Sequence, residues 1–177
     1  MQFQKIFTSV TILIISSLTS FGDLIAGINF GDNQAEIENK LKASPLADAE
    51  INSTLFGRTG INGTFKTTRK LGGYQYSIYY NWDSNNTLEN LNFHSQHIST
   101  NEFQGELKSS WFYLTNFLSS LHGKATNPAD YPTKGQIAMD AIYFTHEWKT
   151  ENGYLYMGPG LEKDGYTLVI TFSKKRL

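Results

Sequence analysis

The sequence predicts an α+β domain in which two helices pack on one or two antiparallel sheets of about seven strands, arranged as hairpins and a C-terminal meander. Three patterns support this prediction. Residues 101–123 have the spacing of an amphipathic helix, residues 74–82 alternate between apolar and polar side chains, and residues 143–173 contain short alternating stretches joined by Asn-Gly and Asp-Gly turns. Because a helix with a wide apolar stripe must cover another element, we expect the long helix to lie on the sheet.

Residues 1–22 are predicted to be a secretory signal peptide, and residues 23–177 a single domain. Lys5 gives a positive start, and the apolar run that follows is too short to span a bilayer as a helix. Small residues place the expected cleavage after Gly22, with cleavage after Ala26 and an uncleaved anchor as alternatives. We therefore expect an exported protein, periplasmic or secreted, with no stable membrane span once the signal is removed.

A short helix is predicted near the start of the domain. Asn33 and Glu36 match a capping box, in which each side chain accepts a hydrogen bond from the other residue's backbone N–H. Ile37 and Leu41 then form a narrow apolar stripe on one side of the helix.

After this helix the period changes to two, which predicts strands over residues 50–56, 64–71, 74–82 and 88–97. The third of these has the clearest alternation, so one of its faces should pack and the other should meet water. The turn between the last two strands is Asp83-Ser84-Asn85-Asn86, and these residue types favour turns.

The long helix is predicted over residues 101–123. Glu102 and Glu106 lie in its first turns, where the helix dipole favours negative charge, and Gly123 fits a left-handed residue at the C-terminal end. The residues expected on its buried stripe are Phe103, Leu107, Trp111, Leu114, Leu118 and Leu121.

The remaining residues are predicted to form a loop and then the meander. Residues 124–135 are rich in loop-forming residues, and residues 137–142 fit either a helical turn or the start of a strand. The predicted strands are 143–150, 154–157 and 166–173, with Gly158-Pro159-Gly160 as a rigid turn in the loop between the last two. A helix followed by hairpins thus occurs twice, at 32–97 and 101–173, which suggests a weak two-part repeat.

The composition narrows the classes of function. The formal net charge of -1 leaves no basic excess to neutralise phosphates, so we expect no nucleic-acid partner. The chain has no cysteine, which excludes disulfides and a lipid-bearing cysteine. No cofactor motif is present, and we predict no cofactor.

The histidines give only weak evidence for chemistry. His94 and His97 form an H-x-x-H pair, but residues three apart on a strand point to opposite faces, and no carboxylate cluster completes a metal site. His146 lies between Phe144 and Trp148, and we interpret it as a packed, hydrogen-bonded core residue. We therefore predict no metal site and no catalytic residue.

Four tyrosines are the candidate binding residues. The period alone does not place all of them on inner faces, and exposed tyrosines are favoured in protein interfaces and on sugar platforms. They are Tyr79, Tyr131, Tyr154 and Tyr156. Packing within an aromatic-rich core or at a sheet edge is the alternative.

One segment carries a resemblance to known families. Residues 28–41, INFGDNQAEIENKL, resemble the Phe-Gly and helix module near the mature start of small exported bacterial proteins. The later order, with residues 121–124 closing a helix before a strand carrying Trp148 and a hairpin meander, is also similar to β-lactamase-inhibitor proteins and outer-membrane assembly lipoproteins. The chain departs from the lipoproteins in lacking a lipid-bearing cysteine, and from many inhibitor modules in lacking a disulfide. The resemblance implies this fold and a role in binding protein, and it transfers no functional residue.

Taken together, these features predict a non-enzymatic exported protein that binds another protein, in the manner of an inhibitor module. Two alternatives stay open. The first is a small hydrolase or ligand-binding enzyme that uses His94, His97 or His146 with a carboxylate, and the second is a sugar-binding module. The sequence gives no indication of the oligomeric state.

Overall fold

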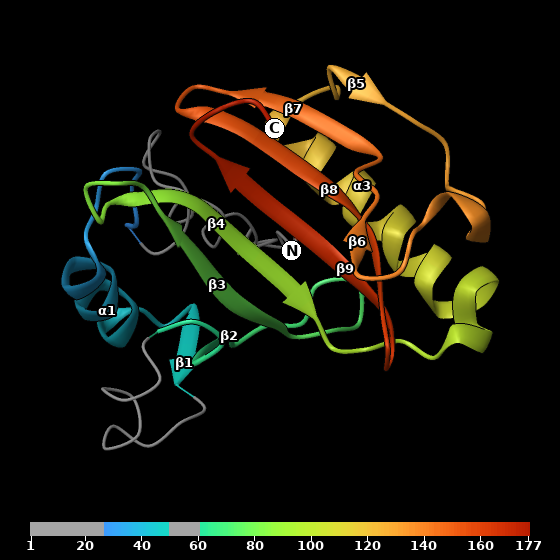
Figure 1. Ribbon diagram of the computed structural model, residues 1–177, viewed down its shortest axis with the longest axis horizontal. Helices are drawn as coiled ribbons and strands as arrows, with labels where there is room; N and C mark the ends of the chain where they lie inside the picture. The colour runs from blue at the N-terminus through green and yellow to red at the C-terminus, as the bar shows by residue number, and fades with distance from the viewer. Residues whose placement is uncertain (1–26, 50–60) are drawn as a thin grey trace, which may run out of the picture.

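The protein has an α+β fold built on one large antiparallel sheet (Figure 1). The computed structural model describes residues 27–49 and 61–177, so the predicted signal peptide and the strand predicted over residues 50–56 lie outside the described part. Within the described part, nine strands form the sheet in the order β1-β2-β3-β4-β9-β8-β7-β5, and β6 pairs with β8 beside this path. The α+β prediction is confirmed, with one sheet of nine strands where about seven in one or two sheets were expected.

The elements have the following bounds. The helices are α1 (Gln34–Ala43) and α3 (Lys108–His122), with a π-helical turn at Phe103–Leu107 and 3-10 turns at Thr100–Glu102 and Lys134–Gln136. The strands are β1 (Ala47–Ala49), β2 (Phe65–Thr67), β3 (Tyr76–Trp82), β4 (Leu88–Ser95), β5 (Asn127–Pro128), β6 (Ala141–Ile142), β7 (His146–Thr150), β8 (Gly153–Glu162) and β9 (Gly165–Ser173). No helix among the described residues is both long enough and apolar enough to cross a membrane.

The sheet consists of two sequential sets of strands joined at its centre. Strands β1 to β4 pair in chain order, as do β7, β8 and β9, and the last strand of each set, β4 and β9, pair with each other. The predicted C-terminal meander is therefore present. The order of a helix followed by antiparallel strands recurs on the two sides of the join, and the two-part repeat remains a prediction.

Helix α1 begins as its sequence predicts. Asn33 Oδ1 accepts the backbone N–H of Glu36 at 3.0 Å, and the Glu36 carboxylate accepts the backbone N–H of Asn33 at 2.8 Å. These two bonds satisfy backbone donors that a helix N-terminus otherwise leaves without partners. Ile37 and Leu41 are fully buried, so the narrow stripe is the packed side.

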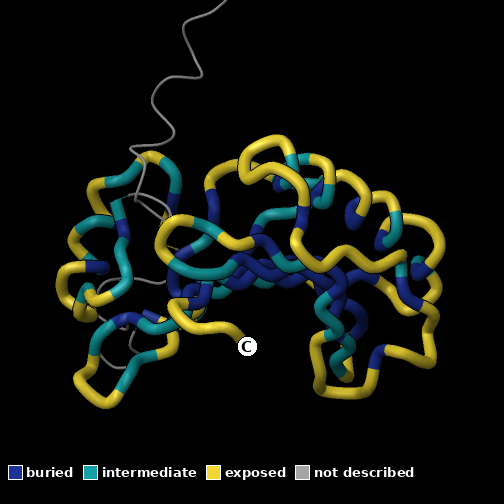
Figure 2. Tube along the Cα trace, turned by 90° about the horizontal axis from the view of Figure 1, so that it is seen from above, coloured by how far each residue is buried: buried dark blue, intermediate teal, exposed yellow. Residues whose placement is uncertain are grey.

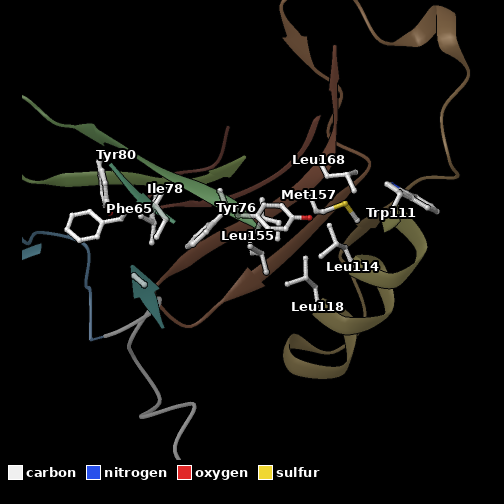
Figure 3. Packing of buried hydrophobic residues seen from close by; sticks show 14 of the residues in the cluster. Phe65, Tyr76, Ile78, Tyr80, Trp111, Leu114, Leu118, Leu155, Met157 and Leu168 are labelled. Atoms are coloured by element: carbon white, nitrogen blue, oxygen red, sulfur yellow. The ribbon is translucent and has the colours of Figure 1, made fainter. Parts of the chain in front are cut away.

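Helix α3 covers one face of the sheet and supplies much of the core. The predicted stripe is buried from Phe103 to Leu118. Figure 3 shows residues of α3 facing residues of β8 and β9: Trp111, Leu114 and Leu118 lie against Leu155, Met157 and Leu168.

The prediction for Leu121 was wrong, because this side chain is 57% exposed. Leu121 continues a row at steps of four from Tyr113 and Phe117, which lies on the flank of the helix rather than over the sheet.

Trp111 is the central residue of this packing. It is 3% exposed, its Nε1–H donates to Thr145 Oγ1 at 2.8 Å, and its ring contacts the rings of Tyr131 and His146. The hydrogen bond satisfies the indole donor, which makes complete burial of this large side chain favourable.

Strand β8 runs through the segment predicted as a turn. Gly158, Pro159 and Gly160 are buried within β8, so the predicted loop there was wrong. The Pro159 carbonyl accepts the backbone N–H of Tyr143 at 2.8 Å, and Gly158 leaves room for the Tyr143 carbonyl oxygen and the Cα of Phe144. Glycine is required because another backbone approaches this closely, which local sequence does not show.

The segment predicted as a loop at residues 124–135 contains the short strand β5, which pairs with β7. Residues 137–142, predicted as either a helical turn or the start of a strand, include the strand β6, which pairs with Gly160 and Leu161 of β8.

Replacing Trp111 by alanine should destabilise the fold strongly. We expect a loss of about 3 to 5 kcal/mol in the free energy of unfolding, because a large buried side chain is removed and the Thr145 hydroxyl loses a donor. Urea unfolding measures this, with Asn116→Ala, at an exposed site on the same helix, as a control expected within about 0.5 kcal/mol of the parent. Equal midpoints for Trp111→Ala and the parent would show that Trp111 is not part of the core.

A methyl group at Gly158 should also destabilise the protein. Gly158→Ala places a Cβ against the backbone of Tyr143 and Phe144, so we expect a cost of about 1 to 3 kcal/mol, as for overpacking. Gly135→Ala is the matched control, since a Cβ there meets nothing within 4 Å. A thermal unfolding midpoint unchanged by Gly158→Ala would contradict the position of Gly158 inside β8.

Candidate functional site

The two faces of the sheet differ in composition. The face under α3, called the helix face, carries most of the apolar residues of β3, β4, β8 and β9. The opposite face carries Tyr79, Tyr154 and Tyr156, and we call it the tyrosine face. In Figure 2, which views the sheet along its edge, α3 lies above the sheet and the C-terminal end of the chain lies below it, on the tyrosine face.

The strand register places five tyrosine-face residues in one row. The paired residues are Tyr79 with Asn92, Asn92 with Thr171, Thr171 with Tyr156, and Tyr156 with Glu147. Directly paired residues of antiparallel strands point to the same side, and neighbouring strands lie about 4.8 Å apart. The row therefore crosses five strands over roughly 19 Å. It brings together residues that are far apart in the sequence.

The structure places three of the four predicted tyrosines on this face. Tyr79 is 37% exposed, Tyr154 is half-buried, and Tyr156 is 4% exposed and stacks beside Tyr154 at 6.4 Å between ring centroids. Tyr131 is separate from them. It is half-buried between Phe103 and the α3 ring of Trp111, and its hydroxyl donates to the Phe103 carbonyl, so its position is explained by packing on the helix side.

Tyr79 is held in place by its neighbours at one end of the row. Its ring lies 4.9 Å from the ring of His94 on the next strand, and Gly63 lies beside its hydroxyl end, where a Cβ would come within 3.2 to 3.4 Å of Cε1, Oη and Cζ. A tyrosine fixed in this way loses little conformational freedom when it binds a partner.

The middle of the tyrosine face offers uncharged hydrogen-bonding groups. The Thr171 hydroxyl donates to Asn92 Oδ1 at 2.8 Å, and Asn92 Nδ2 lies 3.4 Å from Asn81 Oδ1. Asn90 Oδ1 and Thr167 Oγ1 on this face have no hydrogen-bond partner among the described residues, but both atoms are buried and are not accessible to a ligand.

The histidines do not converge on one site. His94 lies on the tyrosine face, whereas His146 is buried on the helix face between the rings of Trp111 and Trp148. His97 lies beyond the end of β4 and pairs with Glu162, with 3.1 Å between Nε2 and Oε2. His146 also bonds Thr145 Oγ1 through Nδ1 at 3.1 Å, which confirms the prediction of a packed, hydrogen-bonded histidine. Within residues 27–49 and 61–177, no three metal-ligating side chains lie together.

The other end of the row is charged and hollowed. A pocket of about 330 Å³ lies beside Tyr156 and Glu147, with Phe144, Pro128 and Leu177 among its walls. Residues 174–177 lie against this end of the face: Arg176 Nε and Nη2 both donate to Glu147 Oε2 at 3.3 Å, and the backbone N–H of Leu177 donates to the Tyr156 hydroxyl at 2.9 Å. Burial raises the pKa of Tyr156, so the hydroxyl is neutral at physiological pH.

Asn92, Thr171 and Glu147 were not singled out from the sequence as site residues. The alternation of β9 places Thr171 opposite the apolar set, and that of β7 points Glu147 away from its neighbours, so the sequence does indicate their side of each strand. It does not indicate which strands are neighbours. The row depends on that order, and in particular on the pairing of β4 with β9.

Comparisons with protein-family models, with curated proteins and with solved structures find no match for this chain. The fold and the geometry of the tyrosine face are therefore the basis for a functional proposal.

Protonation of the buried histidines should make stability depend on pH. Burial lowers the pKa of His146 and of the half-buried His94 below the unfolded value of about 6.5. Below about pH 6.5 the unfolded chain binds protons on these histidines, whereas the folded chain binds them only at lower pH. Their contribution to stability is therefore fully present above about pH 6.5 and is lost as the pH falls toward the folded pKa values. Urea unfolding should give a lower free energy at about pH 5.5 than at about pH 7.5.

An NMR titration of the imidazole carbons tests the same point residue by residue. We expect His146 to titrate below about 6.5. A His146 midpoint at or above that value would show that the ring is hydrated or paired with a negative charge, against its position between two tryptophan rings.

Proposed function

We propose that the chain is an exported, non-enzymatic protein that binds another protein through the tyrosine face, in the manner of an inhibitor module. The observation that supports this is the row from Tyr79 to Glu147, which aligns aromatic, amide, hydroxyl and carboxylate groups across five strands. Tyr79 and Asn92 are its accessible members, whereas Thr171 and Tyr156 are buried. The export step rests on the signal-like residues 1–22, which lie outside the described part of the chain.

The chemistry of this face suits a protein partner. Tyrosine is enriched at the energetic centres of protein interfaces, since it contributes apolar area and a hydrogen bond with few rotatable bonds. On β3 and β4 the groups beside Tyr79 are His94, Asn92 and Asn81, which are uncharged or, in the case of His94, have a pKa lowered by burial. Lys66 of β2, paired with Ser77, is a charged group on the same face. Such a surface costs less to desolvate than one of lysines and glutamates.

The alternatives have weaker support. A hydrolase that uses His94 and His146 together needs these rings to share a cleft, and the register places them on opposite faces of the sheet. His97 does pair with a carboxylate, that of Glu162, but both side chains of this pair are solvent-exposed. A sugar-binding module needs a row of exposed tyrosine rings, and Tyr156 is only 4% exposed. We therefore base the proposal on protein binding alone.

Substitution of Tyr79 tests the proposal. The tagged chain is used to capture a partner from the extracytoplasmic fraction, and the affinity of the identified partner is then measured by titration. We expect Tyr79→Ala to weaken binding by about tenfold or more, since truncation of an interface tyrosine commonly costs more than 1 kcal/mol.

Tyr113→Ala is the matched control, because this tyrosine is 49% exposed but lies on α3, on the other side of the sheet. It should leave the affinity unchanged, and thermal unfolding of both variants checks that they fold. Equal affinities for Tyr79→Ala and the parent, or a larger loss from Tyr113→Ala, would move the interface away from the tyrosine face.

A further inference from the structure

The C-terminal residues of the described chain make a series of contacts across the sheet. Residues 174–177, Lys-Lys-Arg-Leu, which we call the tail, leave the end of β9 and reach β4, β8 and β7. We propose that the charged end of the tyrosine face is a docking site for a basic peptide segment of the partner, and that the tail occupies this site in the free protein. This inference rests on the proposed protein-binding function and specifies the chemistry of the partner.

The first argument is the arrangement of the tail's ion pairs. Lys175 Nζ lies 2.6 Å from Glu89 Oε1 on β4, and Arg176 Nε lies 3.2 Å from Glu147 Oε1 on β7. The two carboxylates belong to strands on either side of the β9–β8 pair. The site therefore recognises two successive basic residues at two separate points, which defines a direction for a bound peptide.

The second argument is the hydrogen bond and the pocket beyond the ion pairs. The Tyr156 hydroxyl accepts a hydrogen bond from the backbone N–H of Leu177, one residue after the arginine. This contact would form with any residue other than proline at that position, because it involves the main chain and no side chain of the peptide. Leu177 is also among the residues around the pocket of about 330 Å³, with Phe144, Pro128 and His146. Polar residues, Asn127 and Thr145 among them, also line this pocket, and the Leu177 side chain is 61% exposed. The contact that the tail makes here is therefore its backbone hydrogen bond to Tyr156.

The third argument is the balance of charge. Glu89 and Glu147 are the acidic groups paired with the tail. Asp83, whose pKa is lowered mainly by hydrogen bonds from Thr87 and slightly by Lys174, is a third acidic group beside it. Lys149, two residues after Glu147 on β7, is a basic group at this end of the same face. Lys66 of β2 is on this face at the other end of the sheet. Without the tail the site has an acidic excess, which attracts a basic segment and repels an acidic one.

The tail is held loosely enough to be displaced. The side chains of Lys175 and Arg176 are 74% and 61% exposed, and exposed ion pairs are weakened by water and by salt. As a tethered segment, the tail competes through an effective concentration on the order of millimolar. To replace it, a free segment must be present at a comparable concentration or must have a higher affinity for the site than the tail has.

The experiment measures binding of the peptide Lys-Lys-Arg-Leu to the ¹⁵N-labelled full chain by NMR. Two proteins are compared: the parent, and the double variant Lys175→Ala with Arg176→Ala, whose tail has lost its side-chain contacts. We expect saturable shifts of the Glu147 and Tyr156 amides in the double variant, with affinity about tenfold above that of the parent. Adding Glu147→Gln to the double variant should weaken the peptide about fivefold or more, and the peptide Glu-Glu-Glu-Leu should not bind.

A second measurement does not depend on any variant. In the parent protein, millimolar Lys-Lys-Arg-Leu should move the Leu177 amide resonance toward the position of a free peptide as the tail is released. An unchanged Leu177 resonance together with equal peptide affinity in the parent and the double variant would overturn the proposal. So would a concentration-dependent dimer of the parent that Glu147→Gln abolishes, because the site would then serve a second copy of the chain.

The outcomes of this experiment can be distinguished from the outcomes of the test of the proposed function. If Tyr79→Ala weakens capture of the partner but the peptide binds nowhere on the tyrosine face, protein binding stands and the basic-peptide site does not. If the peptide binds as expected but Tyr79→Ala has no effect on capture, the site stands and the interface around Tyr79 does not.

Discussion

The pairing of β4 with β9 determines the geometry of both faces of the sheet. It joins the two sequential sets of strands through five register pairs, from Asn90 with Ser173 to His94 with Val169. On the helix face this pairing packs Phe93 against Phe172, with 6.1 Å between ring centroids, and on the tyrosine face it brings the Thr171 hydroxyl to Asn92. Because side chains alternate along a strand, a slip of one residue would exchange the two faces of one half relative to the other. Core packing thus maintains the row on the tyrosine face.

The described structure also shows how a chain without cysteine holds an aromatic core. Trp111 and Trp148 are both buried with their indole donors satisfied, by Thr145 Oγ1 and by the Gly123 carbonyl. His146 lies between the two rings as a neutral spacer that hydrogen-bonds Thr145. The two helix-face elements α3 and β7 are therefore joined by polar contacts as well as by apolar area, and such contacts favour a single arrangement of the rings.

The parts of this structure that could be predicted from the sequence are those set by local interactions. The capping box of α1 needs residues three apart, and the stripe of α3 needs only the helical period, so both were visible. Gly158 in β8 was misassigned because its requirement for glycine comes from the backbone of Tyr143, a tertiary contact. Leu121 on α3 was misassigned because its exposure depends on how the helix is oriented over the sheet, which the helical period alone does not determine. The candidate tyrosines were found from composition and alternation. Their grouping was not, because it follows from strand order, which also separates Tyr131 from the other three.

The short strands at the two ends of the described sheet restrict how a partner can attach. β1 has three residues and β5 has two, one of which is Pro128 and lacks a backbone donor. Many proteins capture an extended partner by adding it as one more strand, which requires a long edge with free backbone groups. Neither end strand offers such an edge. Within the described sheet, the groups available for the proposed recognition are therefore side chains standing on its faces, such as Tyr79, rather than the backbone of an edge strand.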